Sequence, residues 1–187
     1  MHLPRRSGKV VSSTECKESM AALGQRKQFA LDTNLLYDLA SEEDFAHTLR
    51  EIFQERGYQL LIPPTVIQEI TFASCKKTGE GRELALKSLC SMRSWGLEPF
   101  DLIAVGHGIT ERFAQELIHK GILPDSELND GLILAETALA GIPLLVTSDS
   151  HLLALDSGVL AGCFADSDLR QVSIAHPKPL LRAMKRT

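Results

Sequence analysis

Two apolar stretches of this sequence each end in an aspartate. "QFALD" runs into Asp32 and "PLLVTSD" runs into Asp149, and both stretches have the length and composition of a buried strand. In an open parallel sheet, the carboxyl ends of the strands lie at one edge, and ligands bind outside that edge. The two stretches therefore predict a sheet that brings both carboxylates to one place. Taken alone, each acid is also a common turn residue or helix N-cap.

Strand-like and helix-like segments alternate from Gln28 onward. This alternation predicts an α/β fold with a central, mainly parallel sheet. Strands are expected at residues 28–32, 58–64, 97–105, 143–149 and 172–176. Helices are expected at residues 41–57, 65–77, 82–95, 109–120, 125–141 and 179–186. The first of these helices has Ser41 and Asp44 in the arrangement of a capping box, and Gly57 at its end.

Residues 1–27 differ from the rest of the chain, because they are polar, mixed in charge and without sustained periodicity. We expect a flexible N-terminal extension there, with Met20 as an alternative start, followed by one domain over residues 28–187. The basic residues near the start have no apolar stretch behind them, so we expect no secretory signal, and the sequence has no run of about 18 apolar residues. Its four cysteines form no C-x-x-C pair, which fits a reducing compartment. We therefore expect a cytoplasmic protein without a membrane segment.

Two further carboxylates lie on the apolar faces of predicted helices. Glu69 shares a stripe with Val66 and Ile70, and Asp130 heads a stripe that continues with Ile133. A carboxylate in an apolar stripe is costly unless something pairs with it, which favours a functional role. The alternative for Glu69 is a favourable interaction with the dipole at its helix start.

Other polar residues near these acids are expected to play lesser parts. Glu127 lies one turn before Asp130 and could join the cluster, whereas Asp125 is suited to an N-cap. Glu136 falls on the opposite helix face from Asp130, so we expect it to be solvated. His151 follows the strand expected at residues 143–149 and is expected to be a surface residue or an indirect support of the acids rather than a metal ligand.

The four carboxylates together predict a site for divalent cations. Two like charges about 4 Å apart repel by about 4 kcal/mol at an effective dielectric near 20, so a cluster of four needs cations among them. Oxygen ligands suit Mg²⁺ or Mn²⁺. Such a cluster serves metal-assisted hydrolysis of phosphodiesters. The sequence shows neither a Ser or Cys nucleophile with a positioned His nor a glycine-rich phosphate loop.

The ordered motifs "LDTN", "VIQEI", "NDGLILAETALAG" and "LLVTSD" resemble those of PIN-domain ribonucleases. The chain looks most like VapC-type toxins of bacterial type II toxin–antitoxin modules, over about residues 28–181. The resemblance implies a three-layer α/β/α fold, Mg²⁺- or Mn²⁺-dependent endoribonuclease activity, a homodimer and an antitoxin partner. It also implies that one acidic quartet is both catalytic and metal-binding, formed by Asp32, Glu69, Asp130 and Asp149.

Small polar residues accompany the acids in this family pattern. The resemblance implies that Thr147 or Ser148 positions a water or a phosphate oxygen. Thr33 and Asn34 also match small polar positions of the family, where turn and cap geometry is an equal explanation. The chain departs from the pattern at His151, where some relatives have a further acid, and this leaves open whether one or two metals bind.

A band of basic residues around Gly79–Gly81 is a candidate contact for RNA phosphates. It comprises Lys76, Lys77, Arg82, Lys87 and Arg93. For each of them a solvated helix face is the simpler explanation, and the net charge of -4 gives no general attraction for nucleic acid.

Two alternatives to a toxin nuclease are a stand-alone RNA-processing nuclease and a non-catalytic PIN-fold module that binds RNA or protein. A phosphotransferase of the haloacid type is disfavoured, because it needs a second Asp where this chain has Asn34.

Overall fold

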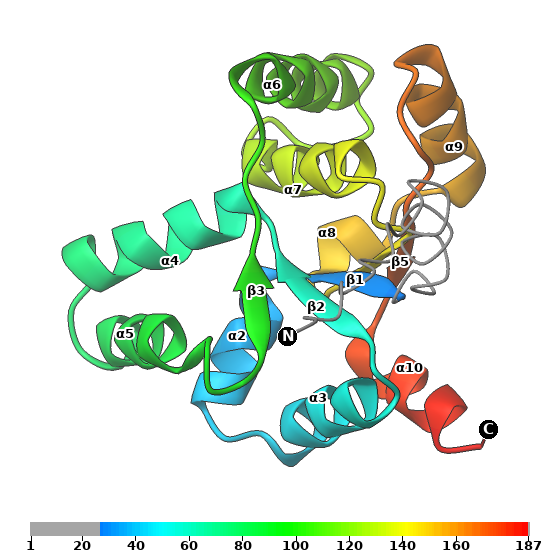
Figure 1. Ribbon diagram of the computed structural model, residues 1–187. Coiled ribbons are helices and arrows are strands. Elements are labelled where there is room, and N and C mark those ends of the chain that lie inside the picture. Colours follow the sequence, from blue (N-terminus) through cyan, green and yellow to red (C-terminus); the bar gives the residue numbers. More distant parts are fainter. Residues whose placement is uncertain (1–26, 187) are drawn as a thin grey trace, which may run out of the picture.

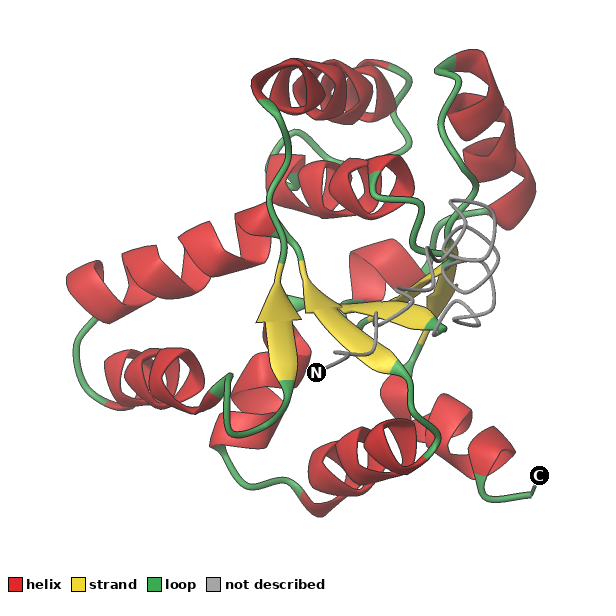
Figure 2. Ribbon diagram, viewed as in Figure 1, coloured by secondary structure: helices red, strands yellow, loops and turns green. Residues whose placement is uncertain are grey.

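The computed structural model describes residues 27–186. The expected flexible extension, and Met20 as an alternative start, lie outside the described residues. Within residues 27–186 the chain forms one sheet with helices on both of its sides (Figures 1 and 2). No helix in this part of the chain is both long enough and apolar enough to cross a bilayer.

The sheet has five strands in the order β3-β2-β1-β4-β5, and every neighbouring pair is parallel. The strands are β1 Gln28–Leu31, β2 Gln59–Ile62, β3 Leu97–Pro99, β4 Leu144–Val146 and β5 Ser173–Ala175. Ala30 of the central strand is fully buried and aligns with Leu61 on one side and Leu145 on the other. This arrangement confirms the predicted three-layer α/β/α fold.

Nine helices of four or more residues connect and follow the strands within the described range. They are α2 Thr33–Ala40, α3 Asp44–Glu55, α4 Pro64–Lys76, α5 Glu80–Ser91, α6 Ala104–His119, α7 Leu128–Leu139, α8 Ser150–Leu153, α9 Ser157–Asp166 and α10 Pro177–Met184. Helix α4 begins at Pro64, directly after Pro63 at the N-cap position, and the fixed backbone angle of proline suits the first helical turn.

Several predicted boundaries were wrong. The capping box does not form, because Ser41 ends α2 and α3 begins after Glu43, which makes no side-chain cap. The eight residues of α2 form two turns that bury Leu35 and Leu39, and this segment and α9 had no predicted assignment. The strand expected at 97–105 ends at Pro99, and α6 begins soon after it.

Helices α6 and α7 pack closely because Gly131 has no side chain. A Cβ atom at Gly131 would lie 2.9 Å from the Cβ atom and 3.0 Å from the Cα atom of Ala114. Helix α7 starts later than expected, with Glu127 rather than Asp125 at the N-cap position. The close packing fixes the first turn of α7, which carries Asp130.

Glu136 is buried rather than solvated, so its predicted exposure was wrong. Its side chain is only 2% exposed, and its two carboxylate oxygens accept hydrogen bonds from Thr65, one from the backbone N–H at 3.1 Å and one from the hydroxyl at 2.7 Å. The Glu136 carboxylate on α7 thus accepts from a backbone N–H in the first turn of α4, where such groups have no partner within their own helix. Glu136 is therefore a structural acid that joins two helices.

Candidate active site

Strands β1 and β4 are neighbours, so the two aspartates that follow them lie at one edge of the sheet. The backbone N–H of Asp32 donates to the carbonyl of Val146 at 3.1 Å, which extends the ladder to the strand end. Asp32 then caps α2, because its Oδ1 accepts from the N–H of Thr33 at 2.7 Å. Asp32 is therefore the N-cap of α2 and also lies at the edge of the sheet that carries Asp149.

Asp32 is 3% exposed, and this burial affects its protonation. Its Oδ2 accepts a hydrogen bond from the Thr147 hydroxyl at 2.6 Å. Burial raises the pKa of Asp32 to about 6, opposed by the hydrogen bonds from Thr147 and Thr33 and assisted by the charges of Glu69 and Asp149. The influence of these two acids places all three in one electrostatic cluster.

Thr147 connects the two aspartates. Its hydroxyl donates to Asp32 and accepts from the backbone N–H of Asp149 at 2.8 Å. Its side chain is fully buried, and its hydroxyl orients both acids. Ser148 and Asn34 are partly exposed beside the two acids.

Glu69 extends from α4 toward the same edge and is held by two side chains. Its Oε2 accepts from the Thr33 hydroxyl, and its Oε1 accepts from the Asn129 amide at 2.7 Å. Thr33 thus links the β1 end to α4. Asn129 was not among the predicted site residues, although its place beside Asp130 in "NDG" put it on the first turn of the same helix.

Asp130 is the most perturbed acid of the group. Its pKa is raised to about 8, first by burial and then by the negative charges of Asp149, Asp32, Glu127 and Glu69, in that order. Its Oδ2 atom is buried and accepts no hydrogen bond from any group in residues 27–186. A buried carboxylate oxygen without a partner, surrounded by other carboxylates, is the environment that a bound cation would stabilise.

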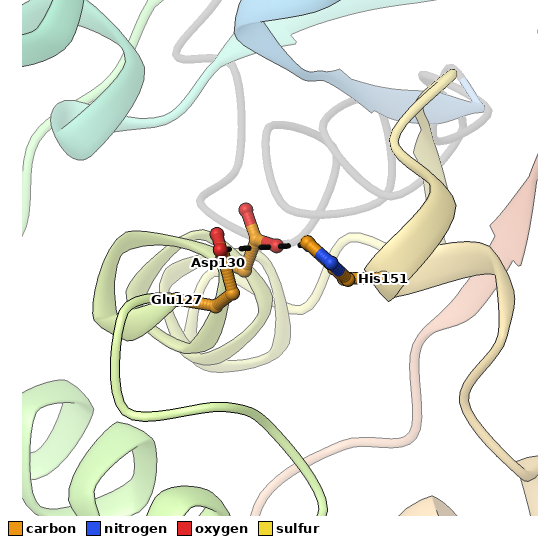
Figure 3. Close-up of side chains that lie close together, drawn as sticks. All are labelled: Glu127, Asp130 and His151. Atoms are coloured by element: carbon orange, nitrogen blue, oxygen red, sulfur yellow. Dashed lines mark ion pairs between the residues drawn. The ribbon is translucent and has the colours of Figure 1, made fainter.

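Two more residues lie beside Asp130 in Figure 3. The side chains of Glu127 and His151 point toward each other. From the sequence, Glu127 could join the cluster, and His151 was expected to be at most an indirect support. The Nδ1 atom of His151 is 3.6 Å from Glu127 Oε1 and 3.8 Å from Asp149 Oδ1. One donor atom from each of Glu127, Asp130 and His151 lies within 4.8 Å of the others.

The donor set fits a divalent cation. Asp32, Asp130 and Asp149 supply carboxylate oxygens from two strand ends and one helix, and Glu69 is held close by. One Asp149 oxygen is already used, because Oδ1 caps α8 by accepting from the N–H of His151 at 2.7 Å. Carboxylate oxygens favour hard cations such as Mg²⁺ and Mn²⁺.

A cavity of about 560 Å³ opens beside Glu69. Glu69, Thr33 and Asn129 line its polar side, and Tyr37, Phe72 and Lys77 line the remainder with other residues. The phenyl ring of Phe72 is largely exposed.

Only part of the basic band, the candidate contact for phosphates, lies at this cavity. Lys77 lines it and Lys76 is exposed nearby. Arg82 donates from Nε to the carbonyl of Ser74 at 3.0 Å, and Lys87 pairs with Glu42 at 2.7 Å. Arg82 and Lys87 thus have structural partners.

Replacing Thr147 with valine removes the hydroxyl that orients both aspartates and keeps the side-chain shape. We expect the affinity for Mn²⁺ to fall by about 10- to 100-fold, which is the usual cost of losing a group that orients metal ligands. Titration calorimetry with Mn²⁺ measures the change. A Ser148→Ala variant is the control, and equal losses in both variants would contradict the special role of Thr147.

Comparisons with known proteins bear on the family and the fold of this chain. The family model described as "PIN domain" matches residues 29–158. Among solved structures, VapBC2 from Rickettsia felis, bound to a DNA fragment from its promoter, superposes with a TM-score of 0.55 at 19% identity. The match covers 80% of this chain and 98% of that one, and at this identity it shows a shared fold. No curated protein sequence matches the chain.

Proposed function

The chain belongs to the PIN domain family, and from this premise we propose that it is a cytoplasmic Mg²⁺- or Mn²⁺-dependent endoribonuclease. One observation carries the proposal. Asp130 has a buried oxygen without a partner among the described residues, and the charges of Asp32, Glu69 and Asp149 all act on it. A structural role would leave this oxygen unsatisfied, whereas a cation would satisfy it and offset the repulsion.

Each acid has a part that follows from its own contacts. Asp32, Asp130 and Asp149 would hold the cation, and Thr147 keeps the two strand-end acids in place. Glu69 has both oxygens engaged by Thr33 and Asn129, so its carboxylate is fixed beside the cavity. When bound, the cation supplies activation of a water and neutralisation of charge on the phosphate.

The cavity beside Glu69 suits a segment of single-stranded RNA. Phe72 and Tyr37 offer aromatic surface for stacking bases, which contributes about 1–3 kcal/mol per base in other proteins. Lys77 offers a positive charge to a phosphate, and Lys76 extends that charge along the helix end. Local contacts of this kind, together with the cation, offset the net charge of -4.

We further propose that the protein is the toxin of a toxin–antitoxin pair and forms a homodimer. Ile103 and Val105 at the start of α6 are 80% and 70% exposed, and exposed apolar side chains fit a surface covered by a partner. The similar fold in Rickettsia felis belongs to a complex named VapBC2. A stand-alone nuclease would have the same site without an antitoxin.

Metal removal tests the central claim. We expect purified protein to cleave a mixed structured RNA with Mg²⁺ or Mn²⁺, to lose all cleavage in EDTA, and to regain it when metal is added back. The products are followed on sequencing gels. Cleavage that persists in EDTA would refute the metal dependence, and Mn²⁺ binding without cleavage of any RNA would favour the non-catalytic module.

A further inference from the structure

The two edges of the sheet differ in how they resist the addition of another strand. Strand β3 forms one edge and β5 forms the other (Figure 1). Strand β3 contains Glu98, which is charged, and Pro99, which lacks an N–H, and both features hinder pairing with a further strand. Strand β5 reads "SIA" and contains neither a charged residue nor a proline. The β5 edge therefore carries no such block.

The backbone of β5 leaves one residue directed away from the sheet. The N–H of Ser173 donates to the carbonyl of Pro143 at 2.9 Å, and the carbonyl of Ala175 accepts from the N–H of Thr147 at 3.1 Å. Alternate residues of a parallel strand bond to the same neighbour, so the N–H and C=O of Ile174 point away from β4. No further strand pairs with β5 in the described part of the chain. Ile174 thus offers one donor and one acceptor to an added strand.

An apolar cavity of about 270 Å³ lies beside this edge. Leu152, Leu153 and Leu160 line it from α8 and α9, and Val172 and Ile174 line it from the β5 segment. Leu153 is 37% exposed although it is apolar. An open edge strand beside an apolar cavity suits an extended segment, because the backbone supplies hydrogen bonds and the cavity receives alternate side chains.

The distribution of charge indicates which segment fits. Residues 121–169, which include α7, α8 and α9, contain eight Asp or Glu residues and no Lys or Arg. Residues 1–27 contain six Lys or Arg residues and two Glu. Asp156, the N-cap of α9, lies in sequence between Leu155 and Ser157, which both line the cavity. The start of the chain is therefore complementary in charge to the helices beside the cavity.

One stretch near the start of the chain has the composition of a strand. Val10 and Val11 are adjacent β-branched residues, and they follow Lys9 and precede two serines. We propose that residues 9–13, "KVVSS", add to the open edge of β5 as a sixth strand, with one of the two valines in the cavity. This inference does not depend on the proposed nuclease function, because it concerns the opposite edge strand from β3 and not the acidic cluster.

The connection between this segment and β1 is long enough. Lys27 is fixed at the start of β1, because its carbonyl accepts from the N–H of Gln59 at 2.9 Å. A strand beyond β5 would lie three strand spacings from β1, which is about 14 Å at about 4.8 Å per spacing. Residues 14–26 can span about 40 Å when extended. An antiparallel orientation needs the shortest connection, because it places the end of the added strand where β1 begins.

Amide hydrogen exchange, followed by NMR on the full chain, tests the proposal without relying on activity. We expect the Ile174 amide of the wild type to exchange at least about 10-fold more slowly than an exposed amide. In the double variant Val10→Asp and Val11→Asp this protection should disappear, because the new charges face acidic helices and no apolar side chain fills the cavity. The Ser173 amide should stay protected in both proteins, because it donates to Pro143, and it reports that β5 is still folded.

The double variant Ala21→Asp and Ala22→Asp is the matched control, because it adds the same charge to the same part of the chain outside residues 9–13. It should leave the Ile174 amide protected. Rapid exchange of this amide in the wild type, or equal loss of protection in the two double variants, would overturn the proposal. Protection that disappears on dilution would show that a second copy supplies the strand and would reject pairing within one chain. An unprotected Ile174 amide, together with shifts of the Val10 and Val11 signals on adding single-stranded RNA, would reject the sixth strand in favour of an RNA-binding arm.

Discussion

Asp32→Asn is expected to lower the rate of RNA cleavage by about 10³-fold or more while the protein stays folded. The amide that replaces the carboxylate keeps one oxygen to accept from the N–H of Thr33, so the start of α2 is preserved. The substitution removes the negative charge from the most buried acid of the site, and loss of one preorganised charge or ligand has an effect of this order. Single-turnover cleavage at saturating Mn²⁺ measures the chemical step.

Asp38→Asn is the matched control for this variant. Asp38 lies on α2, the helix that Asp32 caps; burial also raises its pKa, and its Oδ2 is likewise buried without a partner in residues 27–186. Its charged neighbours, however, are Glu43, Lys178 and His176 rather than the site acids. We expect near-normal cleavage from Asp38→Asn. Comparable losses in the two variants would mean that buried charge at α2, and not the site, controls activity.

The acids at the strand ends were predictable because strand patterning is local. An apolar run that ends in Asp indicates both the strand and the edge at which it stops, and the pairing of β1 with β4 brings Asp32 and Asp149 together as expected. Glu69 and Asp130 were identified in the same way, from a carboxylate inside an apolar helical stripe. The structure brings all four within one electrostatic cluster.

Other features depend on packing between distant segments, which local patterns do not record. Glu136 was expected to be solvated because it lies opposite Asp130 on α7, yet α4 covers that face and Thr65 satisfies the carboxylate. The apolar residues almost all round α7 were the available signal for this burial. His151 reaches Glu127 only because α8 lies beside the start of α7.

Short elements were missed for a related reason. Helix α2 has eight residues, too few for a hydrophobic period to stand out from the preceding strand, and its stability comes from burying Leu35, Leu36 and Leu39. The direction in which the Thr147 side chain points was not evident from the sequence. A threonine at a strand exit can face solvent or neighbouring acids, and here its hydroxyl meets Asp32.

Asp130→Asn is expected to stabilise the metal-free protein and to destabilise it relative to the wild type when Mn²⁺ is present. The folded-state pKa of Asp130, about 8, lies above the ordinary value of 3.8, so folding of the wild type loses stability as pH rises from about 4 to about 8 and then levels off. The Asp130→Asn variant does not lose stability in this way, because asparagine does not titrate. Allowing for partial exposure of the side chain, we expect a gain of about 1–2 kcal/mol at pH 8.5 and almost none at pH 4.5.

Mn²⁺ reverses the order because a ligand that binds only the folded state stabilises it by mass action. At about 100 times the dissociation constant this gain is about 2.7 kcal/mol for the wild type, and the variant with a lost ligand should gain much less. Thermal melts at both pH values, in EDTA and in Mn²⁺, measure four stabilities for each protein. Asp38→Asn should keep the full Mn²⁺ gain. If Mn²⁺ stabilises Asp130→Asn as strongly as the wild type, then Asp130 does not bind the cation, and its raised pKa reflects burial and repulsion alone.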